Sequence, residues 1–200
     1  MNIKSLIAVL CLLIYFGCGS EDDGVFAPKP RAYPRVMYPE NAAYQQFDES
    51  YCNFTFQFPS YGKITQDKLF FDEEAKDPCW FDIDIKELNG RIHCSYYPIN
   101  KENSFDQLRT DAFTLAGKHT IKADYIDELP INKPNNVNGF VFDIQGPAAS
   151  PFQFYLTDST QHFLRGSLYV NAKAEPDSLA PVYEYLKKDV MHLINTFEWR

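Results

Sequence analysis

The sequence predicts an α+β domain, in which an antiparallel sheet carries a capped helix from the middle of the chain and an amphipathic C-terminal helix packed on it. Three observations support this prediction. Phenylalanine-rich segments alternate with polar residues, which is typical of strands with one buried face. The joints between the later segments are short, so neighbouring strands should run antiparallel. Two helical patterns interrupt and close the series, giving the order strand, hairpin, helix, strands, helix.

The N-terminus has the pattern of a lipoprotein signal peptide. Lys4 supplies a positive charge, residues 6–16 form an apolar run too short to span a bilayer, and Gly17 precedes Cys18, whose thiol would be acylated. We expect cleavage to remove residues 1–17 and to leave a lipid on Cys18. An ordinary signal peptide with an incidental cysteine and an uncleaved anchor are the alternatives, and both also deliver the chain outside the cytoplasm.

A lipidated tether is expected from residue 18 to residue 46. It is acidic at residues 20–23 and is then punctuated by prolines, which favour extended, polyproline-like conformations. The acidic residues resemble the surface-export signal of Bacteroidetes lipoproteins, while solvation of a linker explains them equally simply. Residues 47–200 are then expected to form a single α+β domain.

Composition places this domain among globular proteins with a sizeable core. The 200 residues are 45% hydrophobic and include 17 Phe and 13 Tyr, which suits a sheet-rich interior. The formal net charge is -8 and no basic stripe appears, so we do not expect a nucleic-acid partner.

The dipeptide Asn89-Gly90 is the strongest hairpin signal in the chain. A two-residue turn there would pair Ile85 with Cys94. Alternation then places the apolar residues of both strands on one face, with Asp82 and Asp84 on the other. These carboxylates could be presented to a cation, but the plainer interpretation is two solvated carboxylates on a polar strand face.

The cysteines of the expected domain allow at most one disulfide within the chain. In the hairpin register above, Cys79 lies several residues beyond Cys94 along the ladder, too far for their sulfur atoms to bond. Cys52 and Cys79 each open an alternating segment on its core face. We therefore predict a disulfide between Cys52 and Cys79, with Cys94 as a buried free thiol.

Two helices are expected on either side of the later strands. Ser104 and Gln107 form a capping box for the first helix, which should end near Gly117. The segment 121–129 is ambiguous, and a turn cluster follows it. Three strands are then indicated by apolar alternation, around residues 140–144, 152–156 and 164–170. The final helix starts near Pro176 and has an apolar stripe that can cover a sheet face, made of Leu179, Val182, Leu186, Val190, Leu193, Ile194 and Phe197.

Motifs that carry catalysis are absent from the sequence. It contains no zinc-protease, nucleophile-elbow, phosphate-loop or Cys-x-x-Cys pattern. The four histidines are scattered, so each is expected at the surface or in packing. Residues 157–160 combine hydroxyls with a carboxylate, but these residue types at a tight hairpin make local backbone bonds. We therefore predict no catalytic residues, no metal ligands and no cofactor.

The loop after Gly146 is the best candidate for a functional surface. Ala148, Ala149 and Ser150 carry little side chain, so another backbone could approach closely, and Phe152 follows at once. We predict that these four residues bind a partner, with a compact strand connection as the alternative interpretation.

Several continuous segments carry a more specific signal than any short motif. They are residues 28–33, 38–39, 79–83, 118–123, 146–150, 153–160 and 162–169. Together they closely resemble the gliding-motility lipoprotein GldD family of Bacteroidetes, over nearly the whole mature chain. The opening phenylalanine-rich strand and the closing helix also resemble the Mog1/PsbP arrangement of an antiparallel sheet with packed helices.

The resemblance implies a function in the cell envelope. It implies a lipoprotein required for gliding motility and for the associated type IX secretion system, with no catalytic residues. We expect a non-enzymatic assembly or accessory factor, lipid-anchored in the outer membrane on its periplasmic or surface face, whose partners are other envelope proteins of this apparatus. An envelope hydrolase with an unrecognised site and a small-ligand carrier lipoprotein with an aromatic cavity are the alternatives.

Overall fold

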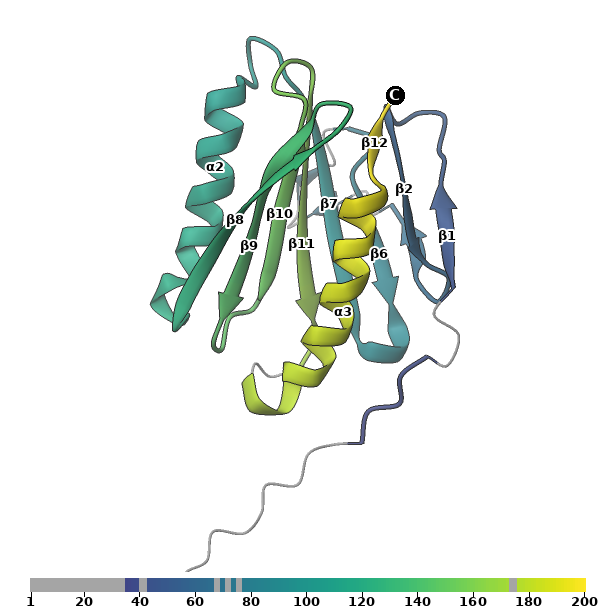
Figure 1. The fold of residues 1–200 in the computed structure, drawn as a ribbon, viewed down its shortest axis with the longest axis vertical. Helices are drawn as coiled ribbons and strands as arrows, with labels where there is room; N and C mark the ends of the chain where they lie inside the picture. Colours follow the sequence, from purple (N-terminus) through teal and green to yellow (C-terminus); the bar gives the residue numbers. More distant parts are fainter. Residues whose placement is uncertain (1–34, 40–42, 67–68, 71–72, 75–76, 173–175) are drawn as a thin grey trace, which may run out of the picture. The chain divides into compact units, whose positions relative to one another are not determined.

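The computed structural model describes residues 35–39, 43–66, 69–70, 73–74, 77–172 and 176–200 (Figure 1). The expected signal peptide, Cys18 and the first part of the expected tether lie outside these residues. Within the described ranges, no helix is both long enough and apolar enough to cross a membrane.

Most strands of the described chain belong to one antiparallel sheet. Its seven strands follow the order β3-β6-β7-β11-β10-β9-β8, so β3 and β8 are its edges. In chain order they are β3 (Lys63–Thr65), β6 (Phe81–Ile85), β7 (Gly90–Pro98), β8 (Tyr125–Lys133), β9 (Val137–Gln145), β10 (Phe152–Thr157) and β11 (His162–Val170).

Helices cover both faces of this sheet. Helix α2 (Phe105–Gly117) packs on one face, while α3 (Pro176–Thr196) packs on the other (Figure 1). A second sheet, in the order β1-β2-β12, shares the core on the α3 side. Its strands are β1 (Tyr44–Phe47), β2 (Phe54–Pro59) and β12 (Glu198–Trp199). The short remaining elements are β4 (Leu69–Phe70), β5 (Glu73–Glu74), η1 (Lys86–Leu88) and η2 (Lys118–Ile121). This architecture confirms the predicted α+β class.

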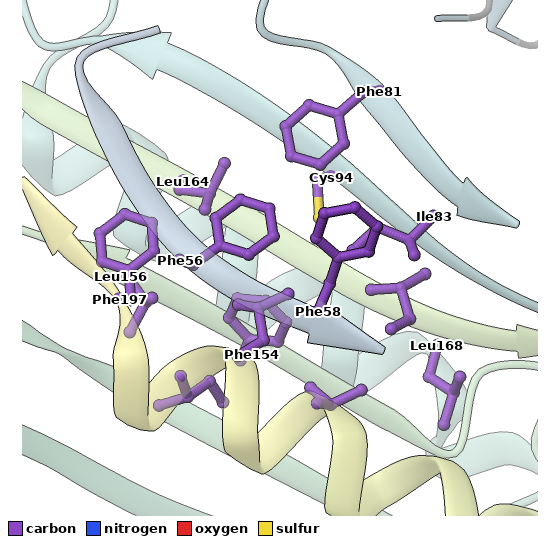
Figure 2. Close-up of a cluster of buried hydrophobic side chains, with 14 of the residues drawn as sticks. Phe56, Phe58, Phe81, Ile83, Cys94, Phe154, Leu156, Leu164, Leu168 and Phe197 are labelled. Atoms are coloured by element: carbon purple, nitrogen blue, oxygen red, sulfur yellow. The ribbon is translucent and has the colours of Figure 1, made fainter. Parts of the chain in front are cut away.

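Phenylalanine rings fill the main core, between the seven-stranded sheet and the layer of β2 and α3. Phe56 stacks on Phe81 of the large sheet at a centroid distance of 5.9 Å and on Phe197 at 6.4 Å (Figure 2). Each buried ring removes a large apolar area from water. Packing of these rings between the two layers is therefore the dominant contribution to the stability of the domain. The high phenylalanine content therefore serves packing between two sheets.

Gly166 makes room for one of these rings. It pairs directly with Phe154 across β11 and β10. A Cβ at Gly166 would lie 2.2 Å from the Phe154 ring, so only glycine permits this ring to lie flat over the neighbouring strand. The glycine that interrupts the strand pattern in the sequence is thus a requirement of the core.

A smaller core lies under α2. Leu108 and Ala112 of the helix pack against Phe142, Tyr155 and Phe163 of the sheet. Helix α2 begins as predicted, because the Ser104 hydroxyl accepts a hydrogen bond from the backbone N–H of Gln107 at 3.3 Å. It also ends at Gly117, as the sequence pattern predicts.

The hairpin around Asn89 differs from the predicted one. The 3-10 turn η1 precedes Asn89, which adopts a left-handed conformation with φ of 53°. Consequently Ile85 pairs with Gly90, and Cys94 pairs with Phe81 rather than with Ile85. The predicted two-residue turn and its register are therefore wrong. The shift is four residues along the ladder, and an even shift leaves every side chain on its predicted face.

Cys52 and Cys79 form a disulfide with a Cα–Cα distance of 5.7 Å. Both lie just before strands, Cys52 before β2 and Cys79 before β6, so the bond ties the two sheets together. Cys94 is a buried free thiol in the main core, as expected from the alternation of β7. The pairing agrees with the sequence analysis, although the register used to exclude Cys94 does not.

The first described strand begins inside the range expected to be tether. Tyr44 pairs with Pro59, and Phe47 pairs with Phe56 at the other end of β1. Before it, Val36 packs against the main core and Tyr38 stacks on Tyr185 of α3 at a centroid distance of 4.7 Å. The domain therefore includes residues that the proline content of the sequence assigned to an extended linker.

Candidate functional site

The predicted partner-binding residues do not form one exposed surface. Ala148 is 1% exposed, because it packs in the smaller core under α2. Ser150 is fully buried, and Phe152 is 4% exposed. Only Ala149 is exposed. The expectation that Ala148 lies free on the loop is wrong, because Ala148 and Ser150 point inward while Ala149 points outward.

Phe152 leads from this loop to a different surface. It opens β10 and faces the α3 side of the sheet, where its ring meets the ammonium group of Lys187 at 5.6 Å from the ring centroid. Together with Val141 of β9 it forms the floor of a groove of about 390 Å³ between β8 and α3. Phe152 is therefore part of a candidate site, reached from the groove and not from the loop.

The rim of this groove carries exposed apolar side chains. Leu129 of β8 is 53% exposed, and Met191 of α3 is 39% exposed. Because they belong to the two elements that border the groove, they flank it from opposite sides. Pro130 and Ile131 of β8 continue the lining. Exposed apolar side chains gathered around a hollow are characteristic of surfaces that bind another molecule. We call this surface the β8–α3 groove.

Strand β8 positions the apolar rim because it is the edge of the large sheet. Leu129 pairs with Val141 and so points to the α3 face, but α3 does not extend over it. Pro130 follows in the middle of the strand and has no backbone N–H to offer to an added strand. The edge is thus poorly suited to extending the sheet, and its exposed feature is the apolar side-chain row.

The charged side chains that line the groove balance in number, with Asp143 and Glu184 against Lys187 and Lys188. The Lys187 ammonium lies 2.7 Å from a carboxylate oxygen of Asp143 and 3.1 Å from one of Glu184. Burial lowers the pKa of Lys187, but the hydrogen bonds and charges of Asp143 and Glu184 outweigh burial and raise it. A paired lysine leaves the groove with little net charge next to it, which favours an apolar occupant.

Sequence reasoning missed Leu129 and Met191. Leu129 lies in the segment whose structure the sequence left ambiguous. Met191 stands beside the predicted apolar stripe of α3 without belonging to it. An apolar residue outside the buried stripe of an otherwise amphipathic helix is the one signal that could have indicated this surface.

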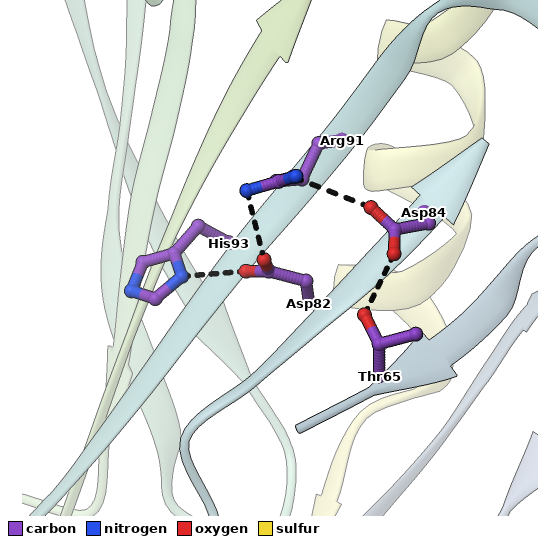
Figure 3. Close-up of polar contacts among 5 residues, drawn as sticks. All are labelled: Thr65, Asp82, Asp84, Arg91 and His93. Carbon is purple, nitrogen blue, oxygen red and sulfur yellow. Dashed lines mark hydrogen bonds and ion pairs between the residues drawn. The ribbon is translucent and has the colours of Figure 1, made fainter. Parts of the chain in front are cut away.

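Asp82 and Asp84 are not available to a cation. The carboxylate of Asp82 lies 2.6 Å from Nδ1 of His93 and 3.2 Å from Nη1 of Arg91 (Figure 3). Asp84 binds Nε of the same arginine at 3.2 Å, and its other oxygen accepts a hydrogen bond from Thr65. Asp82 is 2% exposed, so the expectation of a solvated carboxylate is wrong for it. Among the described residues, no group of histidine, cysteine and acidic side chains has the arrangement of a metal site.

The remaining polar candidates have structural contacts. Asp158 accepts hydrogen bonds from the backbone N–H groups of Thr160, Gln161 and His162, at 2.8 to 3.0 Å. This is the local turn bonding that the sequence predicts for residues 157–160. His162 contacts the Tyr96 hydroxyl at 2.6 Å, and His192 contacts the Gln57 side chain at 2.9 Å.

Comparison with known proteins gives a family match for the chain. A family model described as gliding motility lipoprotein GldD matches residues 23–199. The match starts after Cys18 and covers all of the described residues except Arg200. No curated protein matches the chain. The solution structure of cyanobacterial PsbP (CyanoP) from Synechocystis sp. PCC 6803 is similar at 11% sequence identity and a TM-score of 0.48, over 80% of this chain and 94% of that chain.

Proposed function

We infer, since this chain belongs to the gliding motility lipoprotein GldD family, that it is a non-enzymatic accessory or assembly factor of gliding and of the associated type IX secretion. It acts by holding an apolar side chain of another envelope protein in the β8–α3 groove. The observation that carries this proposal is the exposure of Leu129 and Met191 around a floor of buried Phe152 and Val141.

The chemistry of the groove supports a protein partner of apolar character. Its floor is apolar, and the one lysine that faces Phe152 is paired with two carboxylates. A few apolar anchors that fill a desolvated pocket provide most of the binding free energy in protein interfaces. Leu129 and Met191 would each lose exposed area to such an anchor.

The two alternative functions have less support. A hydrolase would need titratable side chains that converge on the hollow, whereas Asp82 and His93 bind each other elsewhere on the sheet. A carrier of small apolar ligands would need an enclosed cavity, whereas the groove is bordered by side chains that are exposed to solvent.

Lipid attachment places the domain at the membrane. We propose Cys18 as the acylated residue and the outer membrane as the site of anchoring. Replacing Cys18 with alanine should abolish labelling with a fatty-acid analogue and release the protein from the membrane fraction, because no acyl chain then holds it. Retained labelling in this variant would contradict the assignment.

Charge placed in the groove tests the proposed interface. Leu129→Glu and Met191→Glu should each abolish or strongly reduce gliding and secretion, because a carboxylate cannot enter an apolar contact without loss of hydration. Protein abundance should stay normal, since substitutions of exposed residues shift the free energy of unfolding by about 0.5 kcal/mol or less. Crosslinking in intact cells, followed by purification of the tagged lipoprotein, should lose one partner band in both variants.

Ile121→Glu is the matched control. Ile121 is also apolar, and it is 89% exposed, but it lies outside the groove. This variant should glide, secrete and crosslink like the wild type. Normal motility with stable Leu129→Glu and Met191→Glu proteins would refute the groove as the interface.

A further inference from the structure

Polar side chains are buried on the sheet face opposite to the main core. Strands β6, β7, β10 and β11 present apolar residues to α3 and β2, whereas the other side carries polar residues beside Tyr155 and Phe163 of the smaller core. The buried polar residues of this second face are Asp82, His93, Ser95, Gln153, Thr157 and Ser167, each at most 8% exposed. Buried polar groups are costly unless they are paired, so a cluster of this size needs a physical reason.

The strand register places these side chains in two neighbouring rows. Asp82 pairs with His93, His93 with Ser167, and Ser167 with Gln153, which makes one row across four strands. In the next row Ser95 pairs directly with Arg165. Directly paired residues share a face, and so do residues two apart in a strand. Arg165 therefore lies on this polar face, beside Ser167 and opposite Ser95.

The charges on this face are unevenly matched. Arg91 contacts both Asp82 and Asp84, and His93 contacts Asp82, so these groups satisfy one another (Figure 3). Arg165 has a different environment. Its Nη2 donates a hydrogen bond to Oε1 of Gln153 at 3.0 Å, and no carboxylate of the described residues lies within ion-pair distance of its guanidinium.

Burial makes this arrangement costly for Arg165. The side chain is partly buried, and burial lowers the pKa of its guanidinium, while the electrostatic effects of Tyr169, Tyr97 and Asp111 raise it. Arginine nevertheless stays protonated in proteins, so a positive charge remains on the sheet face. The nearest described neighbours of Arg165 on the face are not acidic: Ser95 and Tyr155 pair with it directly, and Phe163 and Ser167 lie two residues away on β11.

These groups have the chemistry of an oxyanion site. A guanidinium has five N–H donors in a planar fork that matches the two oxygens of a carboxylate or phosphate, and Gln153 takes only one of them. Serine hydroxyls on the adjacent positions provide further donors. We propose that Arg165, together with Ser95 and Ser167, binds a small oxyanion, such as the carboxylate or phosphate group of a ligand.

This site is separate from the β8–α3 groove. Phe152 and Val141, the floor of the groove, belong to the α3 face of the sheet, whereas Arg165 belongs to the α2 face. The proposal does not rest on the proposed function, and each can fail without the other.

Ion binding to the intact lipoprotein tests the proposal. The full chain, purified in detergent, is titrated with inorganic phosphate and with acetate while chloride holds the ionic strength constant. At least one of the two ions should raise the midpoint of thermal unfolding in a saturable way, because a ligand that binds only the folded state stabilises it. Saturation by phosphate, by acetate or by both tells which oxyanion class the site takes. If neither ion stabilises the wild type more than chloride does, the proposal is refuted without any variant.

Variants then locate the site. Arg165→Gln should weaken binding by about tenfold or more, because it removes the charge and the fork. Arg109→Gln is the matched control: this arginine is half exposed on α2 and paired with Asp106, so its loss should leave ion binding unchanged. Ser167→Ala and Ser95→Ala cover the case in which Arg165→Gln does not fold, and each should weaken binding several-fold. Wild-type affinity in Arg165→Gln, or in both serine variants, would overturn the assignment.

Discussion

Phe154 and Gln153 are neighbours on β10, and both are at most 2% exposed, but they face opposite sides of the sheet. Phe154 lies flat over Gly166 in a core of rings, where the free energy comes from apolar area and close packing. Gln153 lies among polar groups, where each contribution comes from a specific partner such as Arg165. Burial alone therefore does not tell what a position contributes, and the two faces should respond differently to substitution.

Truncation in the ring core should have the largest effect on stability. Phe154→Ala removes a ring from a packed interior and leaves a cavity that the sheet cannot close, so we expect a loss of about 3–5 kcal/mol in the free energy of unfolding. Urea unfolding of the purified lipoprotein measures this loss. A loss below about 1 kcal/mol would mean that ring packing contributes no more to stability than the polar contacts of the opposite face.

The polar face should lose less stability when one partner is removed. Asp82→Asn keeps the shape of the side chain but removes the charge that binds His93 and Arg91. We expect a loss of about 1–3 kcal/mol, the usual cost of weakening a buried charge-assisted hydrogen bond. Asp84→Asn is the control: its side chain is 23% exposed, so its loss should be smaller. Equal losses of unfolding free energy in Asp82→Asn and Asp84→Asn would show that burial of the carboxylate does not determine its contribution.

The sequence predicts which face a residue occupies better than it predicts its partner across the ladder. Alternation placed Cys94 in the core and His93 on the polar face, and both placements hold although the register shifted. The expected two-residue turn failed because Leu88 is buried, at 5% exposure, and the chain forms a 3-10 turn to bury it before Asn89 reverses direction. Turn length depends on such tertiary packing, which local sequence does not reveal.

The candidate site was harder to predict than the fold. Small side chains suggested an open loop at Ala148, yet a small residue suits close packing under a helix just as well, and α2 covers it. Leu129 is exposed because α3 does not reach the edge strand, which depends on where the helix crosses the sheet. Sequence motifs identify sites whose residues lie close together in the sequence. The groove instead joins Leu129 and Met191, which are about 60 positions apart.

Acid should reveal the contribution of the turn that joins β10 to β11. Burial raises the pKa of Asp158, but hydrogen bonds from the backbone N–H groups of Gln161, His162 and Thr160 outweigh burial and lower it. A carboxyl with a lowered folded-state pKa adds stability above its unfolded pKa of about 4, and this contribution disappears as the pH falls through the folded-state pKa. Asp158→Ala should thus cost about 1 kcal/mol at pH 7 and much less in strong acid.

Unfolding curves at neutral and acidic pH measure this difference. Asp106→Ala is the control, since its side chain is 82% exposed and forms an ion pair with Arg109 on the helix surface. It should change the free energy of unfolding little at either pH. A cost of Asp158→Ala that is equal at both pH values would show that the loss does not come from the ionised carboxylate.

The smallest stability effect is expected for Ala149→Arg, and comparison with the buried Ala148 beside it separates burial from function. Ala149→Arg should change the free energy of unfolding by about 0.5 kcal/mol or less, because Ala149 is exposed. Ala148→Arg should destabilise the domain by several kcal/mol, because a charged side chain cannot fit where Ala148 packs beneath α2. Abundance, thermal unfolding and gliding of the two strains distinguish the cases. Loss of gliding in a stable Ala149→Arg protein would restore the loop as a partner-binding surface, whereas normal gliding leaves the β8–α3 groove as the interface to be tested.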